Sequence, residues 1–399
     1  MNEPRVAGLR VAERQLAGPR AGVVLQGVDT PGVFGGMVEE IESLGFDHLW
    51  LTDSSLHARN CYAYLTLAAA RSSRLLIGTA VTNPATRHPA ITAAAAATVD
   101  EISGGRMILG IGAGDRPLLA LGLRPSRLAT VETAIAGIRA LWRGETVDLN
   151  AENLSAEHLS TEHLSTGDMG RGEFSLSGAH LRFPARADLP VFISASGPKT
   201  LDLAGRVADG VILLVGLFPA ALDWAISRVA RAADAAGRPR PHIAVFAYGA
   251  VAEDEAAALE EARSIAAWFP QTAPYICALA GLPSELVDAV RAGYAGGEFQ
   301  EAAAAARGLP DDFVRKVALA GNQARTAAQI RAALDAGADS VHVFPLGRDR
   351  MATVRAFARA WSAAAGRAIP DPATGNSAVQ NHGPQEAGDR DTTYRTADH

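Results

Sequence analysis

The sequence predicts an α/β fold, a (β/α)8 TIM barrel with a helical insertion before the last strand. Strand-like and helix-like segments alternate along the 399 residues, and eight short apolar segments are strand-like. Two consecutive strands end in turn residues, as expected where a parallel barrel builds a site from its strand ends. The same alternation also permits an open doubly wound sheet, which is the alternative fold.

The predicted strands are short apolar runs bounded by glycine, proline or aspartate, a pattern typical of strands buried on both faces. In chain order they cover residues 22–27, 46–52, 75–82, 107–111, 190–194, 210–215, 242–247 and 340–344. The segments between them predict helices at 33–44, 62–70, 91–102, 127–142, 199–207, 218–236 and 326–336, with a final helix to residue 365. The first of these helices ends before Gly45, because glycine commonly terminates helices.

Composition divides the chain into one large domain and two polar ends. We expect a flexible N-terminus over residues 1–20, a barrel domain over 21–366 and a disordered tail over 367–399. The tail is nearly free of aliphatic residues and cannot bury enough apolar surface to order itself. Within the domain, the alanine-rich segment 251–322 is expected to be a helical insertion that caps the barrel mouth.

A second insertion is expected at the surface over residues 148–172. It contains three imperfect pentads, ENLSA, EHLST and EHLST, which place His158 five residues before His163. A five-residue step does not bring two imidazoles to one helix face as an i, i+4 spacing does. We therefore predict no metal site there.

Charge and cysteine usage exclude several classes of function. The net charge of −6 argues against nucleic acid as a partner. Cys61 and Cys277 lack metal-ligand spacing, so we expect two buried thiols in a reducing compartment. No apolar core of a signal peptide and no apolar run of membrane-spanning length is found, which predicts a cytoplasmic protein without a membrane partner.

Residues 104–123, GGRMILGIGAGDRPLLALGL, carry the strongest local signal. Gly110, Gly112 and Gly114 remove side chains where a strand ends, so that a flat or anionic ligand can approach the backbone. Taken alone the pattern is weak, because an ordinary tight turn without a ligand can also show it, and it matches neither the dinucleotide fingerprint nor the P-loop. Asp53 and Asp115 each follow an apolar strand and are the acidic candidates at the mouth, although Asp115 is also suited to cap a helix.

Residues 194–199, SASGPK, are expected to lead from a strand into a helix N-terminus. Pro198 suits the first helical turn, and free N–H groups with the helix dipole favour an anion there. Lys199 adds a positive charge. The alternative is an ordinary capped turn without a ligand.

Together these segments resemble a known family. VTNPATRHPAIT, GGRMILGIGAGD, ALGL, ISASGPKTLDLAGRVADGVIL and VAEDEAAA occur in order over roughly residues 20–365. They are similar to the luciferase-like superfamily of TIM barrels, and within it to the F420-dependent branch typified by methylenetetrahydromethanopterin reductase.

The resemblance implies a deazaflavin, coenzyme F420, lying across the mouth. It implies a cis peptide bond at or near Ala80–Val81 behind the ring and the coenzyme phosphate at the SASGPK turn. It implies an acidic residue near the reacting carbon at Asp115 and a contact to the coenzyme from Asp53, and it makes both aspartates the candidate catalytic residues. The implied coenzyme-binding residues are Asp53, Ala80, Val81, Thr82, Asn83, Ala113, Gly114, Ala195, Ser196, Gly197, Pro198 and Lys199.

Two positions depart from the family pattern. Many relatives carry histidine directly after the aspartate, where this chain has Ser54, although His57 is close enough in sequence to substitute. The methanopterin reductases carry a glutamate on the first strand, where this chain offers Val24 or Gln26, which weakens the case for a methylene-pterin substrate.

The resemblance thus implies an F420-dependent oxidoreductase that transfers a hydride between the deazaflavin C5 and a C=N, C=C or C=O carbon of a small organic substrate. An FMN-dependent luciferase-like monooxygenase and a non-catalytic flavin- or deazaflavin-binding protein are the alternatives, and a protein-interaction scaffold ranks last. Relatives commonly pair through barrel helices, so we expect a homodimer or higher homo-oligomer.

Overall fold

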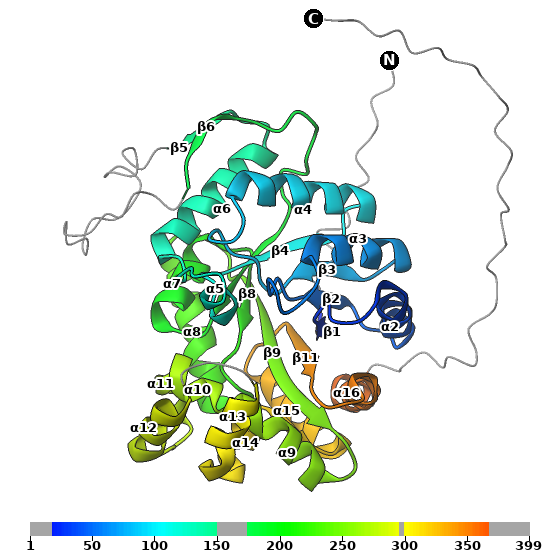
Figure 1. Ribbon diagram of the computed structural model, residues 1–399, viewed down its shortest axis with the longest axis vertical. Coiled ribbons are helices and arrows are strands. Elements are labelled where there is room, and N and C mark those ends of the chain that lie inside the picture. The colour runs from blue at the N-terminus through cyan, green and yellow to red at the C-terminus, as the bar shows by residue number, and fades with distance from the viewer. Residues whose placement is uncertain (1–17, 150–173, 295–298, 367–399) are drawn as a thin grey trace, which may run out of the picture.

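A closed barrel of eight parallel strands forms the centre of the molecule (Figure 1). The computed structural model describes residues 18–149, 174–294 and 299–366. The strands are β1 (Arg20–Leu25), β2 (His48–Leu51), β3 (Leu76–Thr79), β4 (Met107–Ile111), β7 (Val191–Ala195), β8 (Gly210–Leu213), β9 (His242–Val251) and β11 (Ser340–Pro345). Parallel pairing of β1 with β11 closes the ring, which confirms the (β/α)8 barrel and excludes the open doubly wound sheet.

All eight predicted strands belong to the barrel, with shifts at their ends. β3 stops at Thr79 rather than at residue 82, and the chain continues beside β4, where Thr82 forms an isolated bridge with Ile111. β9 runs four residues past the predicted end at 247, and a short extra strand, β10 (Leu319–Gly321), pairs with its last three residues.

Helices surround the barrel (Figure 1). Those that follow the barrel strands are α2 (Pro31–Ser43), α3 (Cys61–Arg71), α4 (Pro89–Ser103), α6 (Leu128–Trp142), α7 (Pro198–Val207), α8 (Pro219–Ala235), α15 (Gln323–Asp335) and α16 (Arg350–Ala365). Side chains at several helix starts satisfy the first free N–H groups: Asn60 for α3, His88 for α4 and Asp349 for α16.

Residues between β9 and β10 form a helical layer, drawn in yellow-green to yellow at the lower end of Figure 1. Its helices are α9 (Glu255–Ala266), α10 (Trp268–Thr272), α11 (Pro274–Leu279), α12 (Ser284–Gly293), α13 (Phe299–Ala305), the 3-10 turn η1 (Ala306–Gly308) and α14 (Asp311–Val317). This layer belongs to the segment whose alanine-rich sequence predicts helices.

Besides β10, the sequence did not predict three further short elements. α5 (Arg116–Leu119) follows β4, and β5 (Val147–Leu149) pairs antiparallel with β6 (Leu176–Ala179). The pentads with His158 and His163 fall between β5 and β6 in the sequence, outside the described residues. Most of the predicted N-terminal segment and the whole predicted tail are also outside the described residues.

The barrel lumen is filled by apolar side chains from the strands. Its central members are Val24, Trp50, Leu76, Ile108, Phe192, Ile212, Ala244, Phe246 and Phe344. A second, larger cluster packs between the strands and the helices. Cys61 and Cys277 are both free and buried, as predicted. In the described part of the chain, every helix is too short or too polar to cross a bilayer.

Three buried histidines lie among the lumen side chains, at the other end of the barrel from the mouth. The His48 and His342 rings are 5.1 Å apart and those of His48 and His242 are 6.3 Å apart. Trp50 Nε1 donates to His342 Nδ1 at 3.1 Å, and Ser340 Oγ lies 2.7 Å from His342 Nε2 and 2.9 Å from His242 Nε2.

These contacts and the burial keep the three imidazoles uncharged. Because His342 Nδ1 accepts from Trp50, this nitrogen must keep its lone pair. Burial lowers the pKa of His48 and of His342 well below the usual value, and it lowers the pKa of His242 to about 4.

Candidate active site

The predicted site residues follow four neighbouring strands, β2, β3, β4 and β7. Asp53 follows β2, residues 80–83 follow β3, residues 113–115 follow β4, and residues 195–199 join β7 to α7. Parallel strands present their carboxyl ends at one mouth, so these segments lie side by side. A Cβ on Gly112 would stand 3.5 Å from Ser194 Cβ, which shows how closely β4 approaches β7 there.

The segment after β3 runs as a bulge against β4. The Ala80–Val81 peptide bond is cis, at the predicted position. Thr82 N–H donates to the Gly110 carbonyl and Gly112 N–H donates to the Thr82 carbonyl, both at 2.9 Å. Residues 80–83 are thereby held along the edge of the mouth.

The three glycines of β4 and the turn after it have packing reasons within the chain itself. A Cβ on Gly110 would lie 1.9 Å from the Thr79 carbonyl oxygen, and one on Gly112 would lie 3.0 Å from Val81 Cγ2. Gly114 has a φ of +86°, which favours glycine. The sequence left either a ligand or an ordinary tight turn as the reason for this pattern. The structure accounts for it within the chain, by the close approach of the β3 bulge at Gly110 and Gly112 and by the backbone conformation at Gly114.

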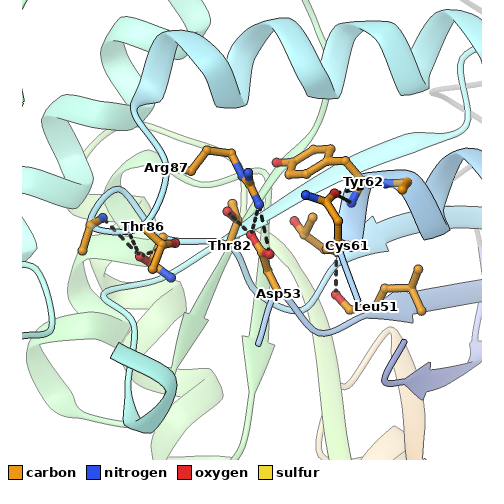
Figure 2. Close-up of polar contacts among 12 residues, drawn as sticks. Leu51, Asp53, Cys61, Tyr62, Thr82, Thr86 and Arg87 are labelled. Atoms are coloured by element: carbon orange, nitrogen blue, oxygen red, sulfur yellow. Dashed lines mark hydrogen bonds and ion pairs between the residues drawn. The ribbon is translucent and has the colours of Figure 1, made fainter. Parts of the chain in front are cut away.

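Asp53 lies at the centre of a buried polar cluster (Figure 2). Thr82 Oγ1 donates to its Oδ2 at 2.8 Å, and Arg87 Nη2 lies 3.1 Å from both carboxylate oxygens. The side chains of Asp53 and Arg87 are 5% and 20% exposed. A buried carboxylate with a charged partner is a strong hydrogen-bond acceptor for a ligand at the mouth.

Arg87 and Tyr62 are the members of this cluster that the sequence reasoning missed. The Arg87 guanidinium carbon lies 4.8 Å from the centre of the Tyr62 ring, a cation–π arrangement. Burial raises the pKa of the Tyr62 phenol far above its ordinary value, so the hydroxyl stays protonated. The available signal was the arginine in NPATRHP, which follows the strand beside the one that ends at Asp53.

Asn83 is mainly occupied by its own loop. Its Oδ1 accepts from Ala85 N–H at 3.1 Å, from Thr86 N–H at 2.9 Å and from Thr86 Oγ1 at 3.1 Å. This turn leads directly to Arg87. The amide oxygen of Asn83 therefore shapes the loop, and the amide nitrogen is the part left for a ligand.

Asp115 stands at the N-cap position of α5, but its side chain makes no capping hydrogen bond. The residue is exposed, and it follows Gly114, whose Cβ position would lie 3.3 Å from Asn83 Cγ. Asp115 therefore occupies the N-cap position, as the alternative interpretation expects, but its side chain does not cap the helix.

The SASGPK turn enters α7 at Pro198, as predicted. Gly197 N–H donates to Thr200 Oγ1 at 3.1 Å, and Thr200 Oγ1 donates back to the Gly197 carbonyl at 2.9 Å. The first turn of α7 has no acidic residue, Lys199 is exposed, and a Cβ on Gly197 would meet Tyr275 Oη of α11 at 2.7 Å. This helix N-terminus can accept an anion.

The structure also places the other positions singled out in the sequence. Val24 is buried in the lumen, whereas Gln26 is half-buried just past the end of β1. His57 is exposed on the loop after β2, beside Leu56, which has a φ of +70°. Within the described ranges no group of histidine, cysteine and acidic side chains could hold a metal ion.

Comparison with known proteins identifies relatives over most of the chain. The profile of the luciferase-like monooxygenase family matches residues 14–340. A 5,10-methylenetetrahydromethanopterin reductase of Methanolobus tindarius is 35% identical over 219 residues, 54% of this chain and 60% of the relative. The corresponding reductase of Archaeoglobus fulgidus is 32% identical over 259 residues, 64% of this chain and 71% of the relative.

Relatives with another substrate are also found. An F420-dependent glucose-6-phosphate dehydrogenase of Microbacterium testaceum is 31% identical over 222 residues, covering 50% of this chain and 59% of the relative. Among solved structures, the coenzyme F420-dependent tetrahydromethanopterin reductase of Methanopyrus kandleri superposes with a TM-score of 0.67. It is 24% identical, and the superposition covers 86% of this chain and 98% of that chain. At this identity the superposition supports the fold.

Proposed function

The chain belongs to the luciferase-like monooxygenase family, and from this we propose that it is an F420-dependent oxidoreductase. It transfers a hydride between the deazaflavin C5 and an electrophilic carbon (C=N, C=C or C=O) of a small organic substrate. The observation that carries the proposal is the similarity to two enzymes whose names state F420 dependence, the tetrahydromethanopterin reductase of Methanopyrus kandleri and the glucose-6-phosphate dehydrogenase of Microbacterium testaceum. What these relatives have in common is the coenzyme.

The residues at the mouth fit this coenzyme. Its phosphate suits the N-terminus of α7, where the first turn lacks an acidic residue and Lys199 adds a positive charge. Asp53 keeps an acceptor position on Oδ1 for a donor group of the ring, because Oδ1 takes a single hydrogen bond, from Arg87, among the described residues. The bulge at residues 80–83 backs the ring, beside Ala113 and Gly114 from the β4 turn.

The two aspartates have different tasks in this proposal. A bound deazaflavin supplies a carbon that gives or takes a hydride. Asp53, enclosed by Thr82 and Arg87, binds and orients the coenzyme. Asp115, exposed at the mouth, supplies a proton or a negative charge to the substrate. The first strand offers only the uncharged Val24 or Gln26 where the resemblance implies a glutamate in the methanopterin reductases, which points away from a methylene-pterin substrate.

Fluorescence titration of the protein with oxidised F420, run beside FMN, tests the cofactor. We expect micromolar binding of F420 and no binding of FMN. Preference for FMN would shift the function to oxygen chemistry, and binding of neither would refute an enzyme of this kind.

Replacing Asp115 separates binding from turnover. With a hydride acceptor found by screening, we expect Asp115→Asn to bind F420 normally and to lose about 100-fold in kcat, the usual contribution of a positioned acid or base. Asp223→Asn, an exposed carboxylate on α8, is the matched control and should behave as wild type. An Asp115→Asn enzyme with wild-type kcat would remove this residue from the chemistry.

The proposal also includes self-association into a homodimer or higher homo-oligomer. Light scattering of the purified protein measures the mass, and a monomer at micromolar concentration would contradict this part.

A further inference from the structure

Asp53 is held from one side by side chains of the β3 loop (Figure 2). Thr82 Oγ1 and Arg87 Nη2 share Oδ2, at 2.8 and 3.1 Å, while Oδ1 contacts only Arg87, at 3.1 Å, within the described part of the chain. A carboxylate offers about four acceptor positions, so three contacts leave one open on Oδ1. The contacts thus fix the direction in which the remaining acceptor position points.

We propose that Arg87 is a positioning residue, which holds Asp53 as an ionised, fixed acceptor for the coenzyme while the Tyr62 ring holds Arg87 in place. This inference rests on the proposed function, because it takes the coenzyme as the group that Asp53 binds. It adds two residues, Arg87 and Tyr62, that work through Asp53 rather than on the coenzyme itself.

The surroundings of Arg87 support this role. Asp53 is its ion-pair partner, and both carboxylate distances involve the single atom Nη2. The guanidinium lies over the Tyr62 ring, and its buried Nε has no hydrogen-bond partner among the described residues. The Arg87 side chain is thus held in place by the Asp53 carboxylate and the face of the Tyr62 ring.

The loop that carries Arg87 is fixed on both sides of it. Before it, Asn83 Oδ1 takes three hydrogen bonds from Ala85 and Thr86. After it, His88 accepts from Ala90 N–H with Nδ1 at the start of α4, and its Nε2 lies 2.8 Å from the Ser175 carbonyl. A backbone anchored at both ends delivers the guanidinium to one place, as positioning requires.

Loss of the Arg87 charge would change the state of Asp53. A buried carboxylate without a counter-ion takes up a proton rather than staying charged. A protonated Asp53 accepts a ligand hydrogen bond poorly. In Arg87→Met the affinity for the coenzyme should therefore fall as the pH is lowered, relative to wild type at the same pH.

The first experiment measures the F420 dissociation constant of wild type, Arg87→Met and Arg87→Lys between pH 5.5 and 8. We expect Arg87→Met to bind about 10-fold more weakly at pH 8, as for loss of an outer partner of a binding group. The ratio of variant to wild-type Kd should rise further toward pH 5.5. Arg87→Lys keeps the charge and should remove this pH dependence of the ratio.

Arg186→Met is the matched control. Arg186 pairs with the buried Asp100 at 2.8 Å, and these side chains are 15% and 7% exposed, close to the values for Arg87 and Asp53. The pair lies at the opposite end of the barrel, where Asp100 also accepts from Met107 N–H at the start of β4. We expect Arg186→Met to lower thermal stability while its F420 affinity keeps the wild-type pH profile.

A double-mutant cycle with Asp53→Asn decides between an indirect and a direct role of Arg87. If Arg87 works through Asp53, then Arg87→Met should change Kd by less than about 2-fold in the Asp53→Asn background. Additive losses would show that Arg87 binds the coenzyme itself and would overturn the inference alone. If wild type binds no F420, the proposed function fails, and the inference fails with it.

Discussion

Gly110→Ala should be among the most destabilising single-methyl substitutions in the barrel. The added Cβ would stand 1.9 Å from the Thr79 carbonyl oxygen and 3.1 Å from its carbonyl carbon. These are backbone atoms of a neighbouring strand and cannot turn away as a flexible side chain can. We expect a loss of about 3 kcal/mol or more in the free energy of unfolding, as for severe overpacking.

Gly110→Ala should also disturb the candidate active site. Thr79 Oγ1 donates to the Gly110 carbonyl at 2.6 Å and accepts from Gly110 N–H at 2.9 Å, and Thr82 N–H donates to that carbonyl. Pushing β3 away from β4 therefore moves Thr82, which holds Asp53. Urea unfolding measures the stability, and F420 titration of the folded variant should show weakened binding.

Gly36→Ala is the control of opposite sign. Gly36 lies exposed in α2, and its Cβ position has no neighbour within 4 Å. Alanine in an exposed helix interior should raise stability by about 0.5–1 kcal/mol. A Gly110→Ala protein within 0.5 kcal/mol of wild type would mean that β3 and β4 can separate at little cost, contrary to this packing.

The barrel could be predicted from sequence because each of its strands is a short apolar run between turn residues. Residues 107–111 show this best, since the predicted strand and β4 coincide. The sequence did not predict β5, β6 and β10. The segments VDL and LSGA are short and, unlike the equally short β2, β3 and β8, do not lie within continuous apolar runs, and LAG lies in the alanine-rich segment predicted to be helical. β10 exists because β9 extends beyond the ring and offers a free edge for pairing.

Only those site residues could be predicted that directly follow a predicted strand or match a family motif. Asp53, Thr82 and Asn83 follow strands and were singled out, whereas Arg87 lies within a loop and Tyr62 on a helix. Arg87 meets Asp53 across 34 positions because β2 pairs with β3 in a register that aligns their ends. The number of residues between two strands in the sequence does not determine the register in which they pair.

The histidine cluster is a further product of barrel closure. His48, His242 and His342 each occur singly in an apolar strand segment, and each alone is best explained as a core residue. Closure of β1 onto β11 and of β8 onto β9 brings them together. Their shared burial has a consequence for stability.

Stability should fall steeply as the pH is lowered from 7 to 5. Desolvation is the main cause of the lowered pKa values, so the unfolded state binds more protons than the folded state below about pH 6.5. The stabilisation is complete above that pH and is lost progressively down to the folded-state pKa, about 4 for His242. From this residue alone we expect a loss of about 2 kcal/mol between pH 7 and 5, and the other two add to it.

Urea unfolding at half-unit pH steps over this range measures the effect, since most carboxylates stay ionised above pH 5. His48→Leu should flatten the pH dependence, because it removes one group that takes up a proton on unfolding. It breaks no hydrogen bond of Nδ1 to the residues that the structure describes. His57→Gln, at an exposed loop histidine, should leave the slope at the wild-type value. Equal slopes for wild type and His48→Leu would show that the cluster already binds protons when folded, because only groups that differ in protonation between the two states contribute to the slope.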